Sequence, residues 1–300
     1  MEVHMIPTLF GLPEAEKLTE LNKGHINRTF LAVCGGESFI LQSLNRSVFR
    51  APEAVMDNIS RIEAAFAKAD DKTVAVPHFL AAGEKNYAEA DGEVWRIYSY
   101  ITASADTAAN AAAAGRAFGT FIRIMDGSEL NSVPAIEGFH DFDRYFSILS
   151  SKSGTDDHIM RKLEKLRGEL SQVFTDSMKK RIIHGDAKAD NVIMSEKSVI
   201  IDLDTVMYGY AAFDCGDLVR SVCKNGYDPD AVKAVTNGFI QGTGGILTPD
   251  EISSLPYGRL WLTAELAMRY LIDSKSETKY FRGKTSEECL ARANQLLEQL

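Results

Sequence analysis

The sequence contains few of the features that tie a chain to a membrane, to nucleic acid or to an oxidising compartment. Its four cysteines are scattered and include no CxxC pair, so neither a zinc site nor a disulfide framework is indicated. It has no run of about 18 apolar residues, and its first residues, MEVHM, do not resemble a signal peptide. A net charge of −9 argues against a general affinity for nucleic acid or anionic membranes. We therefore expect a soluble cytoplasmic protein with reduced thiols.

What the chain does contain is the composition of an ordinary globular protein. With 300 residues, 45% of them hydrophobic and 25% charged, it is long enough for two lobes. Strand-like runs cover residues 29–34, 38–44 and 93–101, and the Gly-Gly pair between the first two is typical of a hairpin. Residues 52–69 repeat apolar side chains at helical spacing. These patterns predict a first lobe, residues 1–101, with one helix packed on a small antiparallel sheet.

Helical patterns dominate the rest of the chain. The alanine-rich segment that follows the first lobe predicts a tightly packed helix, with Asp106 as its N-cap and Gly127 as its stop. The sequences TPDE (248–251) and TSEE (285–288) are capping boxes that predict two further helix starts. We therefore predict an α+β fold, with a helical catalytic and substrate lobe over residues 102–300.

A polar junction, RIIHGDAKADNVIM (181–194), interrupts the helical lobe and is followed by an apolar hairpin. If the turn of this hairpin contains two residues (196–197), Asn191 lies directly opposite Asp202, with the side chains about 5 Å apart. An amide oxygen and a carboxylate at that spacing suit one hard cation such as magnesium. Asp186 adds a second carboxylate at the same end, so the arrangement suits phosphoryl transfer.

The motifs HGDAKADN and IDLDT together resemble the aminoglycoside phosphotransferase and choline kinase superfamily, whose members are relatives of the protein kinases. The resemblance covers essentially the whole chain and implies a two-lobed, protein-kinase-like fold that uses ATP and Mg2+. By position, it makes Asp186 the catalytic base and Lys188 a neighbour of the phosphate. It also makes Asn191 and Asp202 the ligands of the magnesium ion.

A simpler interpretation exists for each of these residues, because loop aspartates and asparagines usually cap turns through their own side chains. The second motif, at the expected distance, favours chemistry for Asp186, Asn191 and Asp202. We interpret His184 as a residue that packs the loop. Asp217, in FDCGDLVRS, is expected to brace the same loop by hydrogen bonds.

The first lobe departs from the family at the strand that normally supplies a phosphate-binding lysine. In FILQSLN that position is Gln42, which carries no charge. Gln42 can hydrogen-bond a phosphate or a base, with Lys188 or Arg46 supplying the positive charge. The alternative is that Gln42 is an ordinary strand residue.

The loop NKGHINRTF (22–30) is another nucleotide-binding candidate. Gly24, Asn27 and Thr29 offer backbone and side-chain donors to phosphate groups. Because the loop lacks the glycine-rich consensus, a plain turn between two strands is the alternative. Tyr100, near the end of the last predicted strand, completes the nucleotide-binding candidates.

The acceptor site is expected in the helical lobe. Glu265, Arg269 and Asp273 recur every four residues along a segment that is otherwise rich in apolar side chains. A stripe of surface ion pairs is the simpler interpretation. The aromatic pair Tyr280-Phe281 follows, however, and suits the apolar face of a sugar ring.

The segments FILQSLNRSVFR and ELAMRYLIDSKSETKYF narrow the resemblance to the N-acetylhexosamine 1-kinase branch. Members of this branch phosphorylate the anomeric hydroxyl of GlcNAc or GalNAc. Gln42 matches the branch, and Arg269 and Tyr280 match its sugar-binding pair. The resemblance thus implies that a sugar hydroxyl lies against Asp186, with Arg269 and Tyr280 holding the ring.

Two other functions stay open at this point. A kinase of another small hydroxyl compound, such as an aminoglycoside, choline or homoserine, requires an acidic pocket for its cationic substrate, which Arg269 disfavours. A non-catalytic nucleotide-binding protein fits the missing lysine, although the three motif residues argue against it. The expected partner is a small molecule rather than nucleic acid or a membrane, and the oligomeric state is not indicated.

Overall fold

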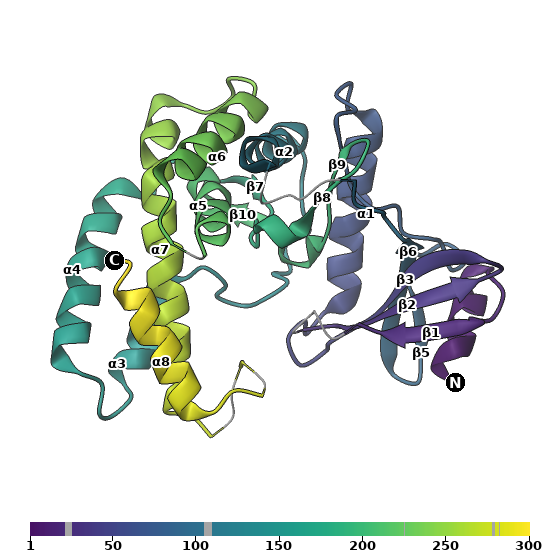
Figure 1. Cartoon of the computed structure of the whole chain (residues 1–300), viewed down its shortest axis with the longest axis horizontal. Coiled ribbons are helices and arrows are strands. Elements are labelled where there is room, and N and C mark those ends of the chain that lie inside the picture. Colours follow the sequence, from purple (N-terminus) through teal and green to yellow (C-terminus); the bar gives the residue numbers. More distant parts are fainter. Residues whose placement is uncertain (22–25, 105–109, 225, 278–279, 282) are drawn as a thin grey trace. The chain divides into compact units, whose positions relative to one another are not determined.

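The computed structural model describes residues 1–21, 26–104, 110–224, 226–277, 280–281 and 283–300. Gly24 and the predicted cap at Asp106 therefore lie outside the described residues. The chain divides into two compact units (Figure 1). The first unit contains Met1–Asn110, Ile124–Glu137 and Asp190–Met207, and the second contains Ala111–Arg123, Gly138–Ala189 and Tyr208–Leu300.

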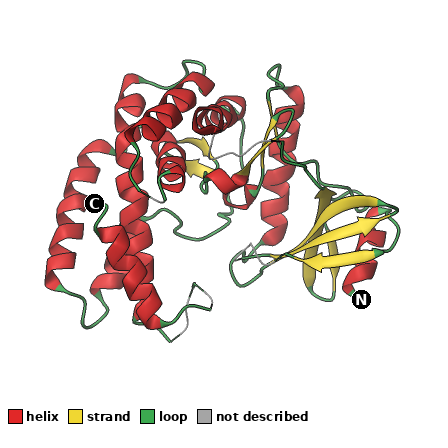
Figure 2. Cartoon of the chain, viewed as in Figure 1, coloured by secondary structure: helices red, strands yellow, loops and turns green. Residues whose placement is uncertain are grey.

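The first unit is built on a five-stranded sheet in which every neighbouring pair of strands is antiparallel (Figure 2). In spatial order the strands are β1 (Lys17–Glu20), β2 (Arg28–Cys34), β3 (Glu37–Leu44), β6 (Glu93–Ser99) and β5 (Ala88–Ala90). Gly35 and Gly36, between β2 and β3, have φ of 61° and 81°, a conformation that glycine adopts without strain. The predicted sheet and its hairpin are confirmed.

The sheet and the helix of the first unit each bury one apolar face. Phe30, Leu41 and Trp95 point from the sheet into a core that also contains residues of the 3-10 helix η1 (Val3–Phe10). Helix α1 (Pro52–Lys68) begins with proline in its first turn, where the missing N–H costs nothing. Its predicted apolar side chains are all buried: Val55, Ile59, Ile62 and Phe66.

A second, three-stranded sheet also belongs to the first unit. Strand β9 (Ser198–Ile200) lies between β4 (Val74–Ala75), to which it is parallel, and β8 (Val192–Met194), to which it is antiparallel. Because Met194 pairs with Ser198, the connection between β8 and β9 contains three residues and not two.

The pairing of Asn191 with Asp202 that we predicted from a two-residue turn is therefore wrong. The N–H of Ile201 donates to the carbonyl of Asn191 at 3.0 Å, which leaves Asp202 one residue further along. Ser195 closes the longer turn, since its N–H and its hydroxyl both donate to the carbonyl of Lys197, at 3.1 and 2.8 Å. Both hydrogen bonds lie within the three-residue connection.

The second unit is mainly helical. Its helices are α2 (Ala111–Met125, of which the last two residues belong to the first unit), α3 (Phe142–Ser150), α4 (Asp157–Val173), α5 (Ala211–Val222), α6 (Pro229–Gly242), α7 (Pro249–Ser274) and α8 (Ser286–Leu297). A short two-stranded sheet pairs β7 (Arg181–Ile183) with β10 (Met207–Gly209). Both predicted capping boxes are present, at Thr248 and Thr285. The α+β class predicted from the sequence is confirmed.

Glycine lets two pairs of these helices touch backbone to backbone. A Cβ atom on Gly119 of α2 would lie 2.1 Å from the carbonyl oxygen of Phe239 in α6. A Cβ atom on Gly216 of α5 would lie 2.2 Å from the backbone nitrogen of Arg259 in α7. The alanine-rich segment is thus a tightly packed helix, as predicted.

Among the described residues, no helix combines the length and the apolar character needed to cross a membrane.

Candidate active site

Asp186 and Lys188 lie in the second unit, in the loop that follows β7. The ammonium group of Lys188 donates to Oδ2 of Asp186 at 2.6 Å, and the two side chains are 35% and 28% exposed respectively. Burial raises the pKa of Asp186. The positive charges of Lys188, His184 and Arg220 lower it by more than burial raises it, so the pKa lies below its ordinary value. Asp186 is therefore an ionised, solvent-accessible carboxylate at neutral pH.

Helix α5 holds the loop that carries Asp186 through hydrogen bonds to its backbone. The buried carboxylate of Asp214 accepts hydrogen bonds from the N–H groups of His184 and Gly185, at 2.7 and 2.9 Å. The predicted brace, Asp217, instead accepts from the guanidinium of Arg220, at 2.9 and 2.5 Å. The bracing role thus falls to the aspartate one helical turn earlier.

His184 is fully buried, and its imidazole lies edge-on to the rings of Phe118 and Phe121. Its Nδ1 accepts a hydrogen bond from the N–H of Asp186 at 3.3 Å. This position agrees with the packing role that we interpreted from the sequence.

The two predicted metal ligands lie in the first unit, where the β8–β9 hairpin opens. Asn191 is 4% exposed, whereas Asp202 is exposed and has a left-handed backbone, with φ of 61°. An amide oxygen and a carboxylate are donors that suit a hard cation. The described residues contain no cluster of three His, Cys, Asp or Glu side chains that could hold a metal. A magnesium ion held by this pair would therefore complete its coordination with phosphate and water oxygens.

Gln42 of β3, where the resemblance implies a lysine, lies beside a cationic side chain that sequence analysis did not identify. Gln42 pairs across the sheet with Arg96 of β6, and Arg96 Nε donates to Gln42 Oε1 at 2.9 Å. Both terminal nitrogens of Arg96 also donate to the carboxylate of Asp204, one of them at 3.1 Å. The side chains of Arg96 and Asp204 are 1% and 2% exposed. Arg46, our earlier candidate for this charge, instead pairs with Glu53 at the surface. The available sign in the sequence was an arginine between the apolar residues Trp95 and Ile97 of the strand EVWRIYS.

Two of the other nucleotide-binding candidates, Thr29 and Asn27, are hydrogen-bonded to residues of the same network. Gln42 Nε2 donates to the hydroxyl of Thr29 at 3.1 Å. Asn27 donates to Asp204 at 2.7 Å and accepts from the backbone N–H of Asn45 at 3.1 Å, so both ends of its amide contact protein. Tyr100 is 49% exposed. The nucleotide contacts assigned to these residues stay predictions.

The structure brings Arg269 and Tyr280 together in the second unit. The guanidinium of Arg269, on α7, lies 4.5 Å from the centre of the Tyr280 ring. Phe281, Phe139 and Tyr145 place three more rings at 5.6, 5.7 and 5.7 Å, so Arg269 fills an aromatic cage. The Arg269 side chain is 13% exposed, and Tyr280 is 43% exposed.

The polar stripe beside this cage is buried, so its interpretation as surface ion pairs is wrong. Glu265 and Asp273 are 1% and 4% exposed. Asp273 accepts from the N–H of Phe281 at 2.8 Å and so holds one wall of the cage. Glu265 lies 3.7 Å from Arg269 and 2.9 Å from Nδ1 of His140, a residue that sequence analysis missed.

Comparison with known proteins identifies the family. A model described as the phosphotransferase enzyme family, APH, matches residues 17–247, which is most of the chain. The protein belongs to this family. Membership places it in the aminoglycoside phosphotransferase and choline kinase-like superfamily that the motifs resemble.

Solved structures show that this phosphotransferase has the kinase-like fold of its superfamily. An amicoumacin kinase, in complex with AMP-PNP and Ca2+, has a TM-score of 0.70 at 16% identity, over 100% of this chain and 94% of that one. A microcompartment-associated aminopropanol kinase has a TM-score of 0.71 at 14% identity, over 99% and 95%. A choline/ethanolamine kinase family protein from Mesorhizobium loti has a TM-score of 0.64 at 19% identity, over 94% and 88%. At these identities the likeness establishes the fold alone.

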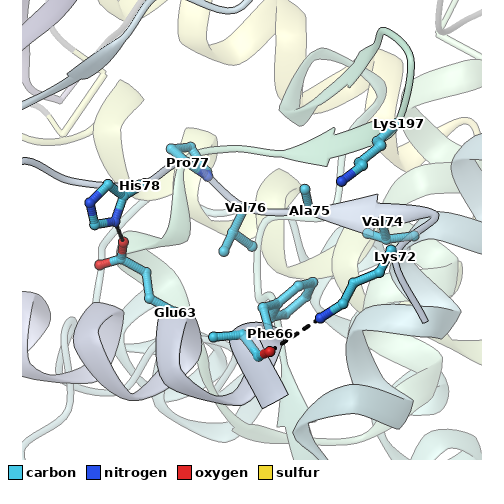
Figure 3. Close-up of a pocket in the computed structure, with 10 residues that line it drawn as sticks. Glu63, Phe66, Lys72, Val74, Ala75, Val76, Pro77, His78 and Lys197 are labelled. Atoms are coloured by element: carbon cyan, nitrogen blue, oxygen red, sulfur yellow. Dashed lines mark hydrogen bonds and ion pairs between the residues drawn. The ribbon is translucent and has the colours of Figure 1, made fainter. Parts of the chain in front are cut away.

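The first unit of this phosphotransferase also contains a cavity of about 260 Å³ that involves none of the predicted site residues (Figure 3). It lies between α1 and the β4 segment, with Phe66 and Val76 among its apolar walls. At its rim, Glu63 and His78 are hydrogen-bonded at 2.8 Å. Lys72 at the rim donates to the carbonyl of Ala67 at 3.1 Å. The cavity is thus separate in residue content from the catalytic motifs.

Proposed function

We propose that this phosphotransferase transfers the γ-phosphate of ATP to the anomeric hydroxyl of an N-acetylhexosamine, GlcNAc or GalNAc, or of a related hexose. Its family membership supports phosphoryl transfer. The observation that carries the choice of acceptor is the aromatic cage, because that cage is already filled by the chain's own cation, Arg269.

A filled cage disfavours a cationic acceptor. Empty aromatic cages bind quaternary and alkyl ammonium groups, as choline-type ligands require. Here the guanidinium of Arg269 occupies that place, and a second cation beside it would be repelled. The proposal thus separates this chain from structural relatives named as choline/ethanolamine and aminopropanol kinases.

The same cage suits a neutral, oxygen-rich acceptor. The guanidinium of Arg269 carries N–H donors and no acceptor, so it favours a carbonyl or hydroxyl oxygen such as that of an acetamido group. Tyr280 exposes a ring on which the apolar face of a sugar can lie. An N-acetylhexosamine combines such an acceptor oxygen with an apolar ring face.

The mechanism that we propose uses Asp186 as the general base. Asp186 accepts the proton of the anomeric hydroxyl as its oxygen bonds to the γ-phosphorus, and ADP leaves from the opposite side. Lys188 holds the carboxylate of Asp186 in one orientation through their ion pair. Asp214 fixes the two N–H groups just before Asp186, so the base does not have to be ordered during the reaction.

On the nucleotide side, the first unit supplies the phosphate and metal contacts in this proposal. Arg96 lies beside Gln42, and its pairing with Asp204 connects β6 to the IDLDT motif. This ion pair positions the segment that carries Asp202. When bound through Asn191 and Asp202, magnesium supplies positive charge that neutralises the phosphates.

The test is an assay of ADP formation with purified protein, ATP and Mg2+. Acceptors are GlcNAc, GalNAc, glucose, choline, ethanolamine, homoserine and one aminoglycoside. We expect turnover with an N-acetylhexosamine and loss of its reducing end, because phosphorylation blocks the anomeric carbon. Turnover confined to the amines would refute the sugar assignment, and no turnover with any acceptor would refute the kinase assignment.

A further inference from the structure

Gly185, the residue just before Asp186, has both of its backbone polar groups held by side chains. Its N–H donates to Oδ1 of Asp214 at 2.9 Å. Its carbonyl oxygen is hydrogen-bonded to Nε2 of His140 at 2.7 Å. Gly185 has φ of 79°, a conformation that residues with side chains rarely adopt. The two contacts hold the Gly185 peptide and so fix the direction of the chain as it enters Asp186.

His140 connects this peptide to the aromatic cage. Its Nδ1 lies 2.9 Å from Oε2 of Glu265, and the other oxygen of Glu265 lies 3.7 Å from the guanidinium of Arg269. His140 and Glu265 are 9% and 1% exposed. A continuous chain of polar contacts within the second unit thus runs from Gly185 through His140 and Glu265 to Arg269.

The Gly185 carbonyl only accepts, so Nε2 of His140 carries a hydrogen and donates to it. The contact between Nδ1 and Glu265 holds one proton between the ring and the carboxyl group, and it is an imidazolium–carboxylate pair when that proton lies on the ring. The His140 ring also stacks on Phe139, with centroids 4.0 Å apart, and lies edge-on to Phe213. Burial lowers the pKa of His140, but Glu265, the carbonyl of Gly185 and Asp217 raise it by more.

The backbone of His140 is adapted to this position. Its φ of 59° is uncommon for a residue with a side chain, and conformations of this kind persist where surrounding contacts fix them. The indole N–H of Trp261, on α7, donates to the carbonyl of His140 at 3.2 Å. Helix α7 therefore holds both the backbone of His140 and, through Glu265, its ring.

We propose that His140 is a positioning residue that holds the Asp186 loop in a fixed position relative to Arg269, the proposed acceptor-binding residue of the second unit. It acts through the Gly185 carbonyl on one side and through Glu265 and Arg269 on the other. This inference rests on the proposed kinase function for its catalytic consequence. The groups that set its charge are Glu265 on α7, with Arg269 behind it, Asp217 on α5 and the dipole of the Gly185 carbonyl.

The first test compares His140→Asn with the wild type. Asparagine tolerates the left-handed backbone but is too short to span both partners. We expect faster hydrogen exchange at the amides of residues 184–188 and a fall in kcat of about 10- to 100-fold, because small displacements of a catalytic group are costly. The KM for ATP should change little.

The second test uses Glu265→Gln, which keeps the shape of the side chain and removes its charge. Without that carboxylate the pKa of His140 falls, so the alkaline limb of the kcat–pH profile should move to lower pH. A residue with only a packing role would leave this limb in place. Glu63→Gln is the matched control, since Glu63 is also hydrogen-bonded to a histidine, His78, whose side chain is 84% exposed.

The outcomes separate the two proposals. If the wild type phosphorylates no acceptor, the proposed function fails, and the exchange measurement still decides the role of His140. Wild-type exchange at residues 184–188 in folded His140→Asn protein would overturn the inference. So would a kcat–pH profile that Glu265→Gln leaves unmoved. Circular dichroism and the fluorescence of the two tryptophans establish that each variant is folded.

Discussion

The two units treat their central charged residues differently. In the first unit, Arg96 and Asp204 are almost fully buried and satisfy each other. In the second unit, Asp186 and Arg269 are 28% and 13% exposed, and they form ion pairs with Lys188 and Glu265 respectively. A buried, satisfied pair can only hold structure, whereas a partly exposed charge can meet a ligand. We therefore expect mutation of Arg96 or Asp204 to act mainly on stability, and mutation of Asp186 or Arg269 to act mainly on turnover.

The strongest test of this contrast is Asp186→Asn. Loss of a positioned general base should lower kcat by about 10² to 10⁴-fold. Acceptor binding, measured by calorimetry, should stay close to that of the wild type, because the amide has the same shape. Asp190→Asn, an exposed aspartate in the same junction, is the control and should retain turnover. Near-normal kcat in Asp186→Asn would remove the residue from the mechanism.

Arg96→Met should have the largest effect on stability. It leaves the buried carboxylate of Asp204 without its main partner, and breaking such a pair typically costs about 3–5 kcal/mol. The free energy of unfolding in urea measures this loss. Adding Asp204→Asn to Arg96→Met should recover part of it, because no charge is then buried alone.

The matched control for that experiment is Arg46→Met. Arg46 pairs with Glu53, and the two side chains are 42% and 38% exposed. Exposed pairs contribute about 1 kcal/mol or less, so its unfolding curve should barely move. Equal losses in Arg46→Met and Arg96→Met would contradict the structural role given to the buried pair.

Arg269→Lys sharpens the second half of the contrast. The lysine keeps the charge but loses the flat guanidinium that lies among four rings. We expect the KM for the acceptor to rise about tenfold, with a smaller change in kcat. Arg259→Lys is the control, since Arg259 also lies over a tyrosine, Tyr227, at 6.0 Å. A KM that does not change would remove Arg269 from the acceptor site.

The smallest expected effect concerns pH. The pKa of His140 is raised in the folded protein, so its stabilisation is complete below the ordinary value of 6.5 and is lost as pH rises through the folded pKa. The urea midpoint should therefore fall as pH rises from about 6 to 9. In Glu265→Gln this slope should be shallower. A slope that is the same in both proteins would contradict the pairing of His140 with Glu265.

Local sequence patterns predicted the elements but not the contacts that join distant segments. The β2–β3 hairpin and α1 follow from a Gly-Gly pair and from helical periodicity, both of which act between near neighbours. The register of β8 and β9 was missed because the connection contains three residues, with hydrogen bonds from the N–H and the hydroxyl of Ser195 to the carbonyl of Lys197, and periodicity does not predict such contacts.

The candidate site was predicted unevenly for the same reason. HGDAKADN and IDLDT are short motifs that are visible in the sequence, so the candidate residues that they contain could be named from sequence alone. Arg96 and Asp204 are 108 residues apart, and His140 and Glu265 are 125 apart. Arg96 and Glu265 stand out as charged residues in apolar segments, but the partner of each becomes evident only in the folded chain. The supporting contacts of a site are therefore harder to predict than the site itself.

The parallel pairing of β4 with β9 has a consequence for how the chain folds during synthesis. Val74 meets Ser198, so this sheet cannot form until the ribosome has delivered the segment that carries β8 and β9. Until then β4 has an unpaired edge, and Arg96 is without Asp204. Long-range parallel pairing of this kind is slow. The early chain should accordingly be vulnerable to proteases and dependent on chaperones until about two thirds of it has emerged.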